Sequence, residues 1–241
     1  MKLNVLFLVV GAWLLTTTAL AQGDKAKYSS WLQYNGTCAL GPRFDVNTVL
    51  QYRSYNTFGD SRLLLGNANL QYNLKSLPAS VAAGYMYLQL RPFSNPEETE
   101  KFDRRENRLY QQLIVNNKFG RSRLLHRYRV EERWTAAGFA MRFRYLASLR
   151  VPLGPRTIEN ASWYATLKDE IRISDGPQPF DSNRIWAGVG HVFNKNLGVE
   201  GLWMTQLEAG GNHNHYVALL IRHDFGWPDA LPTRRPRFLP Q

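Results

Sequence analysis

The sequence predicts an all-β fold, an antiparallel transmembrane β-barrel of about 12 strands, with about 10 strands as the alternative. Between residues 28 and 225, charged and apolar side chains alternate at every second position, in segments of about 10 to 14 residues. A period of two is that of a β-strand, and no segment of this region has a helical period. A soluble sheet can alternate in the same way, so the secretory leader in front of the first strand is what favours an outer-membrane barrel.

The first 21 residues have the three parts of a secretory signal peptide. Lys2 supplies a positive charge, Leu3 to Leu15 is apolar apart from two residues, and Ala19-Leu20-Ala21 is a small-residue cleavage site. The apolar run is too short for an anchor helix, because a membrane span needs about 20 residues. We therefore expect a signal peptide (1–21), an outer-membrane β-barrel (22–225) and a tail (226–241), located in the outer membrane of a Gram-negative bacterium.

The mature chain has no second apolar stretch of spanning length. A membrane protein without spanning helices must close its sheet, because open strand edges cannot be satisfied in lipid. Aromatic residues make up 13% of the chain, which suits the aromatic girdles of such barrels. Cys38 is the only cysteine, which excludes an internal disulfide and a metal site built on thiolates.

Eleven segments have the strand pattern. They lie near 28–38, 43–54, 61–74, 79–91, 106–118, 121–134, 139–152, 161–173, 183–194, 197–208 and 214–225. Short turns at 40–42, 118–120 and 194–196 alternate with longer connectors at 92–105 and 174–182, as in outer-membrane barrels. Bacterial single-chain barrels have an even strand number. We therefore expect either one more strand before Tyr28, or one segment outside the wall.

The tail beyond Phe225 is predicted to be flexible and extended, because proline cannot donate to a strand ladder. Its prolines and arginines are Pro228, Pro232, Pro236, Pro240, Arg234, Arg235 and Arg237. Many outer-membrane barrels end on an aromatic residue that the barrel assembly machinery recognises. Phe225 is the candidate for this residue, although it is not terminal here.

The charged residues are predicted to face the lumen. In segment 139–152, Arg142 and Arg144 share one face, and Phe143 and Tyr145 share the other. A lipid-facing arginine at mid-membrane costs roughly 2–4 kcal/mol, so placing every arginine outward would exceed the stability of a whole fold. The predicted lumen network is Arg108, Arg127, Arg129, Glu131, Arg142, Arg144, Glu170, Arg172, Arg184, Glu200, Arg222 and Asp224. Such charges must pair or keep water, so we expect salt bridges that fill the barrel, with an anion-attracting channel as the alternative.

The formal net charge is +11. An excess of basic over acidic residues often indicates binding to nucleic acid. This chain carries a secretory leader, and its arginines alternate with apolar residues, so nucleic acid is not an expected partner. The expected partners are outer-membrane lipid, lipopolysaccharide through its phosphates, and the barrel assembly machinery. The chain is expected to be a monomer.

Three stretches of the sequence stand out as motifs. They are Glu106-Asn107-Arg108-Leu109-Tyr110-Gln111-Gln112, His126-Arg127-Tyr128-Arg129-Val130-Glu131-Glu132-Arg133-Trp134, and Phe180-Asp181-Ser182-Asn183-Arg184-Ile185-Trp186-Ala187-Gly188. Through them, almost the whole mature chain resembles the bacterial family called domain of unknown function 2490. Val130 and Ser182 stand where the family pattern has leucine and glutamine. The resemblance implies an outer-membrane barrel, and it supplies no activity and no catalytic residues.

Few residues are candidates for chemistry. His213 and His215 lie two apart and could ligate a metal, but no third ligand stands at a telling spacing, so a polar loop is expected. Glu131 and Glu132 are adjacent, so they point to opposite faces and cannot be a paired general acid and base. We predict no catalytic, cofactor-binding or metal site.

Gly188 and Gly190 lie two apart within a predicted strand. They could be mistaken for part of a phosphate-binding loop, but a strand is the wrong context for one. We expect them to leave room for bulky lumen side chains or to permit curvature.

Three functional hypotheses follow. The first is a non-enzymatic structural barrel or a narrow, anion-leaning pore. The second is an enzyme at the rim that acts on outer-membrane lipid or lipopolysaccharide. The third is a periplasmic ligand-binding β-barrel, which is disfavoured because its lumen should be apolar and the predicted lumen is charged.

Overall fold

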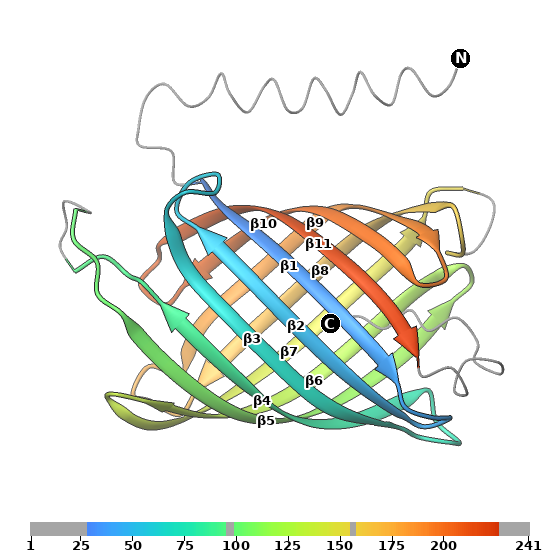
Figure 1. Cartoon of the computed structure of the whole chain (residues 1–241), viewed down its shortest axis with the longest axis horizontal. Coiled ribbons are helices and arrows are strands. Elements are labelled where there is room, and N and C mark those ends of the chain that lie inside the picture. The colour runs from blue at the N-terminus through green and yellow to red at the C-terminus, as the bar shows by residue number, and fades with distance from the viewer. Residues whose placement is uncertain (1–27, 95–98, 155–157, 227–241) are drawn as a thin grey trace, which may run out of the picture.

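The computed structural model describes residues 28–94, 99–154 and 158–226, which form one closed barrel of eleven strands (Figure 1). The strands are β1 (Tyr28–Ala39), β2 (Phe44–Ser54), β3 (Ser61–Asn73), β4 (Ala79–Leu90), β5 (Arg104–Phe119), β6 (Ser122–Thr135), β7 (Gly138–Pro152), β8 (Ser162–Ser174), β9 (Phe180–Asn194), β10 (Leu197–Glu208) and β11 (His213–Gly226). None of the described residues forms a helix long and apolar enough to cross a membrane. The predicted signal peptide and the tail beyond Gly226 lie outside the described residues.

The prediction of 12 or 10 antiparallel strands is wrong, because the barrel closes through a parallel pair. β1 lies beside β11 and runs in the same direction, from Tyr28 opposite His215 to Ala39 opposite Gly226 (Figure 1). All the other neighbouring strands are antiparallel. With an odd number of hairpin-connected strands, the first and last strands run the same way. The prediction of an even strand number assumed that the first and last strands pair in antiparallel orientation. A parallel ladder also pairs the backbone N–H and C=O groups of these two strands.

The strand positions follow the sequence pattern. The largest difference from the predicted boundaries is at β9, which begins at Phe180 instead of residue 183. In β6, Arg127 and Arg129 are buried in the lumen, whereas Tyr128 is 41% exposed on the outside. The alternation of residue types therefore becomes an alternation of inside and outside.

The connectors define two rims. At the N-terminal rim, where β1 begins, lie residues 55–60, 91–94, 99–103, 136–137, 175–179 and 209–212. At the C-terminal rim, where β11 ends, lie residues 40–43, 74–78, 120–121, 153–154, 158–161 and 195–196. The predicted long connectors and predicted short turns fall on opposite rims. The contrast is incomplete, because 136–137 is a tight turn and 153–161 is long.

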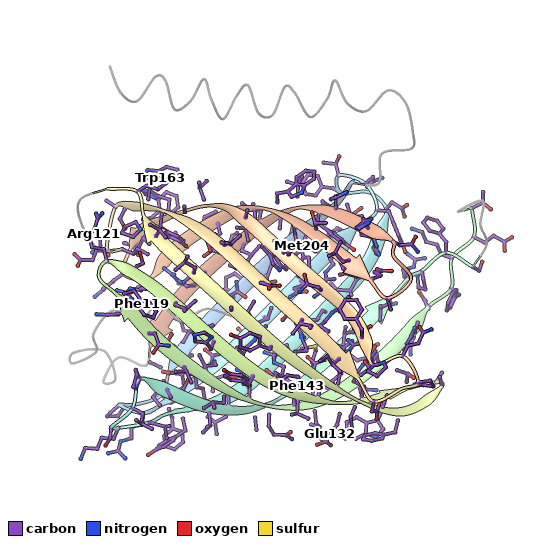
Figure 2. All side chains as sticks on the ribbon, turned by 180° about the vertical axis from the view of Figure 1, so that it is seen from behind. Phe119, Arg121, Glu132, Phe143, Trp163 and Met204 are labelled. Carbon is purple, nitrogen blue, oxygen red and sulfur yellow. The ribbon has the colours of Figure 1, made fainter. Side chains whose placement is uncertain are left out.

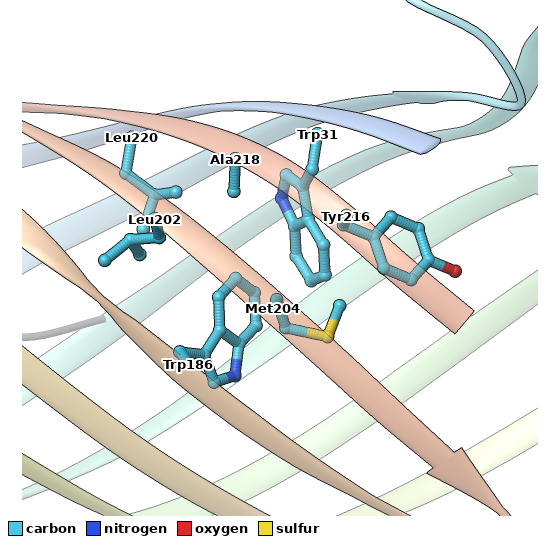
Figure 3. Close-up of a cluster of buried hydrophobic side chains, with 7 residues drawn as sticks. All are labelled: Trp31, Trp186, Leu202, Met204, Tyr216, Ala218 and Leu220. Carbon is cyan, nitrogen blue, oxygen red and sulfur yellow. The ribbon is translucent and has the colours of Figure 1, made fainter. Parts of the chain in front are cut away.

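The inside of the barrel is half apolar, which the prediction of a charged lumen did not include. One buried cluster, on β1 and β9–β11, consists of Trp31, Trp186, Leu202, Met204, Tyr216, Ala218 and Leu220 (Figure 3). A second, on β2–β5, consists of Val49, Leu63, Leu65, Met86, Leu88 and Tyr110. Most of the inward charges lie on β5–β9, so an apolar wall faces a charged wall.

Gly190 leaves room for Tyr164, which confirms the predicted role for this glycine. The two residues are direct partners in the β8–β9 ladder, and a Cβ at Gly190 would lie 2.3 Å from Tyr164 Cζ. Gly84 lies opposite Tyr110 in the β4–β5 ladder, where an added Cβ would lie 2.5 Å from both Ala68 O and Asn69 Cβ and 2.7 Å from the hydroxyl oxygen of Tyr110. An aromatic ring placed beside a strand glycine covers it, and here both rings also fill the lumen.

The outer surface carries an apolar belt. Every strand from β2 to β9, and β11, has at least one exposed large apolar side chain. Representative residues are Leu50, Leu64, Tyr85, Leu109, Tyr128, Phe143, Leu167, Ile185 and Leu219. Figure 2 shows Trp163, another exposed residue, outside the barrel wall. An apolar surface of this extent is unusual on a monomeric soluble protein.

The parallel closure predicts a disulfide. Cys38 and Phe225 are partners in the β1–β11 ladder and lie on the outer face, so Phe225→Cys is expected to oxidise with Cys38. Neighbouring strands lie about 4.8 Å apart, within the range that a disulfide spans. Bond formation is measured by mass spectrometry of the unreduced protein.

Ile221→Cys is the matched control for this experiment. Ile221 lies opposite Tyr34, four residues along β1 from Cys38, or about 13 Å away along the strand. It should stay reduced. If another strand separated β1 from β11, neither variant would form the bond.

Candidate functional site

The lumen contains a cavity of about 540 Å³ next to the N-terminal rim. Its lining runs from Tyr55, Pro92 and Gly210 at this rim to Lys168 and Leu220 near mid-barrel. The cations that line it are Arg53, Arg62, Arg104, Arg108, Arg127, Arg129, Arg133, Arg142, Arg144, Arg172, Arg184 and Lys168. The carboxylates that line it are Glu106, Glu170, Asp181 and Glu208. Among the described residues, twelve cations thus face four carboxylates, and the chamber is strongly positive.

Glu131 is the centre of the charged network and is fully buried beside the cavity. Its Oε1 lies 2.6 Å from Nη1 of Arg144 and 3.6 Å from Nη1 of Arg129. Its Oε2 lies 3.1 Å from Nη1 of Arg108. A buried charge is stable only when it is paired and hydrogen-bonded. This one carboxylate therefore holds side chains from β5, β6 and β7 together.

Arg144 joins Glu131 to a second carboxylate, Glu170. Its Nη2 lies 2.7 Å from Oε1 of Glu170, and the same oxygen accepts a hydrogen bond of 2.8 Å from Arg127. Nη1 of Arg184 lies 3.5 Å from the other oxygen of Glu170. The network thus continues across β8 to β9.

The structure places all twelve predicted lumen charges toward the inside. Ten are at most 9% exposed, while Arg144 and Asp224 are half-buried. One network contains Arg108, Arg127, Arg129, Glu131, Arg144, Glu170 and Arg184. The others lie apart: Arg142 and Arg172 meet on Asp181, Glu200 forms its own cluster, and Arg222 faces Asp224.

On the C-terminal side of the cavity, the side chains around Glu200 pack closely together. Oε1 of Glu200 lies 2.6 Å from Nη2 of Arg150 and accepts a hydrogen bond of 2.8 Å from the hydroxyl of Tyr164. Nζ of Lys168 lies 2.5 Å from Oε2. The space beside this cluster is about 20 Å³, enough for about one water molecule. The cavity is therefore a chamber with an occluded floor.

The predicted network did not include Glu106, although the alternation could have found it. Glu106 accepts hydrogen bonds from Nε of Arg108 and Nε of Arg133, at 2.9 and 2.5 Å. Glu106 and Arg108 lie two apart in β5, and Arg150 shares the face of Arg142 and Arg144 in β7. Their inward direction follows from the same period of two.

Asp181 could not be found in this way. It lies at the start of β9, where the β8–β9 register shifts between Arg172 and Ile173. A bulge re-aims the side chains beside it. Oδ2 of Asp181 reaches Arg142 at 3.2 Å and Arg172 at 3.5 Å, although its position in the alternation matches that of outward residues.

Arg53 has no carboxylate partner among the described residues. It is 8% exposed, its Nη2 donates a hydrogen bond of 2.9 Å to Gln51, and its Cζ lies 3.3 Å from the centre of the Trp31 ring. Arg62 likewise lies over the rings of Tyr55 and Tyr216. These two cations are held by aromatic and amide groups, so their charge is available to an anion.

The residues that the sequence offered for metal binding or acid–base catalysis do not come together in one site. Nδ1 of His215 lies 3.1 Å from the hydroxyl of Thr205 on the outer face. Within the described ranges, no group of three His, Cys, Asp or Glu residues could hold a metal ion. Glu131 is buried, whereas Glu132 points outward, where Gln111 donates to it at 3.4 Å. What the lumen offers a ligand is fixed positive charge.

Replacing Glu131 with glutamine is expected to destabilise the barrel by about 3–5 kcal/mol, because three guanidinium groups would lose a buried counter-charge. The adjacent Glu132→Gln is the matched control, since it removes the same charge from the outer face and should change the stability by less than about 1 kcal/mol. Denaturant unfolding of both variants in the same lipid or detergent gives the comparison. Equal losses would contradict a central role for Glu131.

The comparisons with known proteins agree with the sequence motifs. The family model described as a protein of unknown function (DUF2490) matches residues 28–217, from β1 into β11. No curated protein matches the chain. The match confirms the predicted resemblance and covers most of the barrel. The chain belongs to the DUF2490 family of proteins of unknown function.

Proposed function

We propose that this protein is a non-enzymatic β-barrel of the Gram-negative outer membrane whose lumen is an anion-binding chamber. The observation that carries the proposal is the inverted distribution of polarity. The large side chains exposed on the outer face are mostly apolar, with Leu50 58% exposed, whereas Glu131 and its arginines are buried inside. A belt of apolar residues around a lumen that holds buried charged residues is the pattern of a membrane barrel.

The strand lengths fit this location. The shortest strand, β2, has 11 residues, and a tilted strand crosses the hydrocarbon layer with about 9–11 residues. Aromatic rings also gather near both ends of the barrel. Trp134 packs against Phe139 near the N-terminal rim, and Trp163 packs against His191 near the C-terminal rim. Such rings suit the two interfaces of a bilayer.

The chamber is suited to binding, and its floor limits passage. Its positive lining attracts anions, and the Glu200 cluster occludes the route to the C-terminal rim. If Phe225 is the residue that the assembly machinery recognises from the periplasm, the C-terminal rim faces the periplasm. The chamber then opens toward the cell exterior. We expect a monomer, surrounded by outer-membrane lipid and by lipopolysaccharide at its rim.

Cell fractionation tests the location. The protein is expected in the outer-membrane fraction, and its band should shift on a gel when the sample is boiled, because a folded barrel resists detergent until it is heated. A soluble periplasmic protein without a shift would contradict the membrane proposal. It would favour the periplasmic ligand-binding barrel instead.

Shortening Tyr164, which belongs to the Glu200 cluster at the floor of the chamber, is expected to open an anion-selective pore. Tyr164 is 1% exposed and donates to Glu200 inside, whereas its neighbour Trp163 is 47% exposed outside. In planar bilayers, wild-type protein and Trp163→Ala should conduct little, and Tyr164→Ala should conduct more, with anions preferred. The occluded floor would be refuted by a large wild-type conductance that Tyr164→Ala leaves unchanged.

A further inference from the structure

We propose that the chamber binds a single-chain anionic amphiphile, a molecule with one carboxylate or phosphate head group and one unbranched apolar chain. This inference rests on the proposed anion-binding chamber and adds the class of ligand. It is carried by the position of uncompensated arginines directly beside an apolar wall in the same cavity.

The head-group site lies around Arg53. Arg53 lines the cavity together with Arg62, Arg144 and Arg172. Arg144 is engaged by Glu131 and Glu170, and Arg172 has one carboxylate contact, at 3.5 Å to Asp181. Neither Arg53 nor Arg62 pairs with a carboxylate within the described ranges. Like charges that gather without enough counter-charge are stabilised by an anion bound between them.

Contacts within the protein hold the guanidinium groups of this site in place. The Trp31 ring has Cζ of Arg53 at 3.3 Å and Cζ of Arg184 at 5.4 Å from its centre. Nε of Arg184 donates a hydrogen bond of 2.7 Å to Gln206. Guanidinium groups held by rings and amides lose little freedom when an anion binds, which favours affinity.

The chain site begins next to Arg53. Leu63 is the direct partner of Arg53 in the β2–β3 ladder, and Leu65 lies two residues further along β3. Both line the cavity, together with Met86 and Leu88 of β4. A bare inorganic anion would leave this wall against water. An apolar chain attached to the anion would cover it, and removing apolar surface from water is favourable.

The size of the chamber selects a single chain. A volume of about 540 Å³ lies within the range of about 300–1,000 Å³ that is usual for pockets of small ligands. Larger lipids with several chains would not fit inside it. A neutral chain would fit, but it would leave Arg53 without counter-charge.

The test measures binding to wild-type protein in lipid nanodiscs by calorimetry, with empty nanodiscs as the blank. The probes are octyl phosphate, octanoate, inorganic phosphate and 1-octanol. Octyl phosphate or octanoate should bind at one site, at least about a hundredfold tighter than inorganic phosphate, because each buried methylene group adds roughly fourfold in affinity. The tighter of the two identifies the head group as phosphate or carboxylate.

Two variants locate the site. Arg53→Gln should lower the affinity for octyl phosphate by at least about tenfold, because it removes the cation that has no carboxylate partner among the described residues. Arg105→Gln is its control, since Arg105 is exposed in the same rim region and makes the same change of charge; it should bind like wild type. Leu65→Gln should keep phosphate binding and lose most of the advantage of the octyl chain.

The outcomes separate this inference from the proposed function. If inorganic phosphate binds as tightly as octyl phosphate, the chamber binds anions in general, and the proposal that its ligand is an amphiphile is wrong. If no anion binds, the anion-binding chamber is wrong as well. Binding of 1-octanol as tight as that of octyl phosphate would refute the anionic head group. Unchanged binding by Arg53→Gln that folds normally would refute the location.

Discussion

Closure of the sheet through the parallel pair β1–β11 is the constraint on which the rest of the structure depends. A closed sheet leaves no unpaired edge, and it also divides every strand into an inner and an outer face. Because the inner faces of eleven strands surround one narrow lumen, side chains from distant parts of the sequence must share it. Arg108 of β5, Arg144 of β7 and Arg184 of β9 thereby reach a common network of buried carboxylates.

The balance of charge inside the barrel gives the lumen its two halves. Toward the C-terminal rim, Glu200 neutralises Arg150 and Lys168, and the side chains pack with little space between them. Toward the N-terminal rim, cations outnumber carboxylates, so one carboxylate is shared by two or three guanidinium groups, and some cations rest on aromatic rings instead. The chamber thus lies where charges could not all be paired.

The alternation of residue types predicted most of the site, and its failures have identifiable causes. Glu131 and Glu170 could be assigned to the lumen because strand direction depends only on position along the strand. Asp181 could not, because a register shift turns it toward Arg142. The apolar half of the lumen was also missed. Charged residues identify the inner face of β6. In β3, Leu65 faces inside and Leu64 faces outside, and because both are leucines, the sequence shows no difference in polarity between the two faces.

By itself, the sequence determined that this chain forms strands, where each begins and ends to within three residues, and which face of the charged strands is buried. These properties are local, because a period of two and the turn residues act within a few positions of the chain. Only the tertiary structure decided that eleven strands close through a parallel pair and that Glu131 is shared by three arginines. It also decided that Arg53 lies beside Leu63, with no carboxylate partner in the part of the chain that the structure describes. Those outcomes depend on which strands become neighbours and on how many charges meet in one enclosed volume, and no local pattern contains that information.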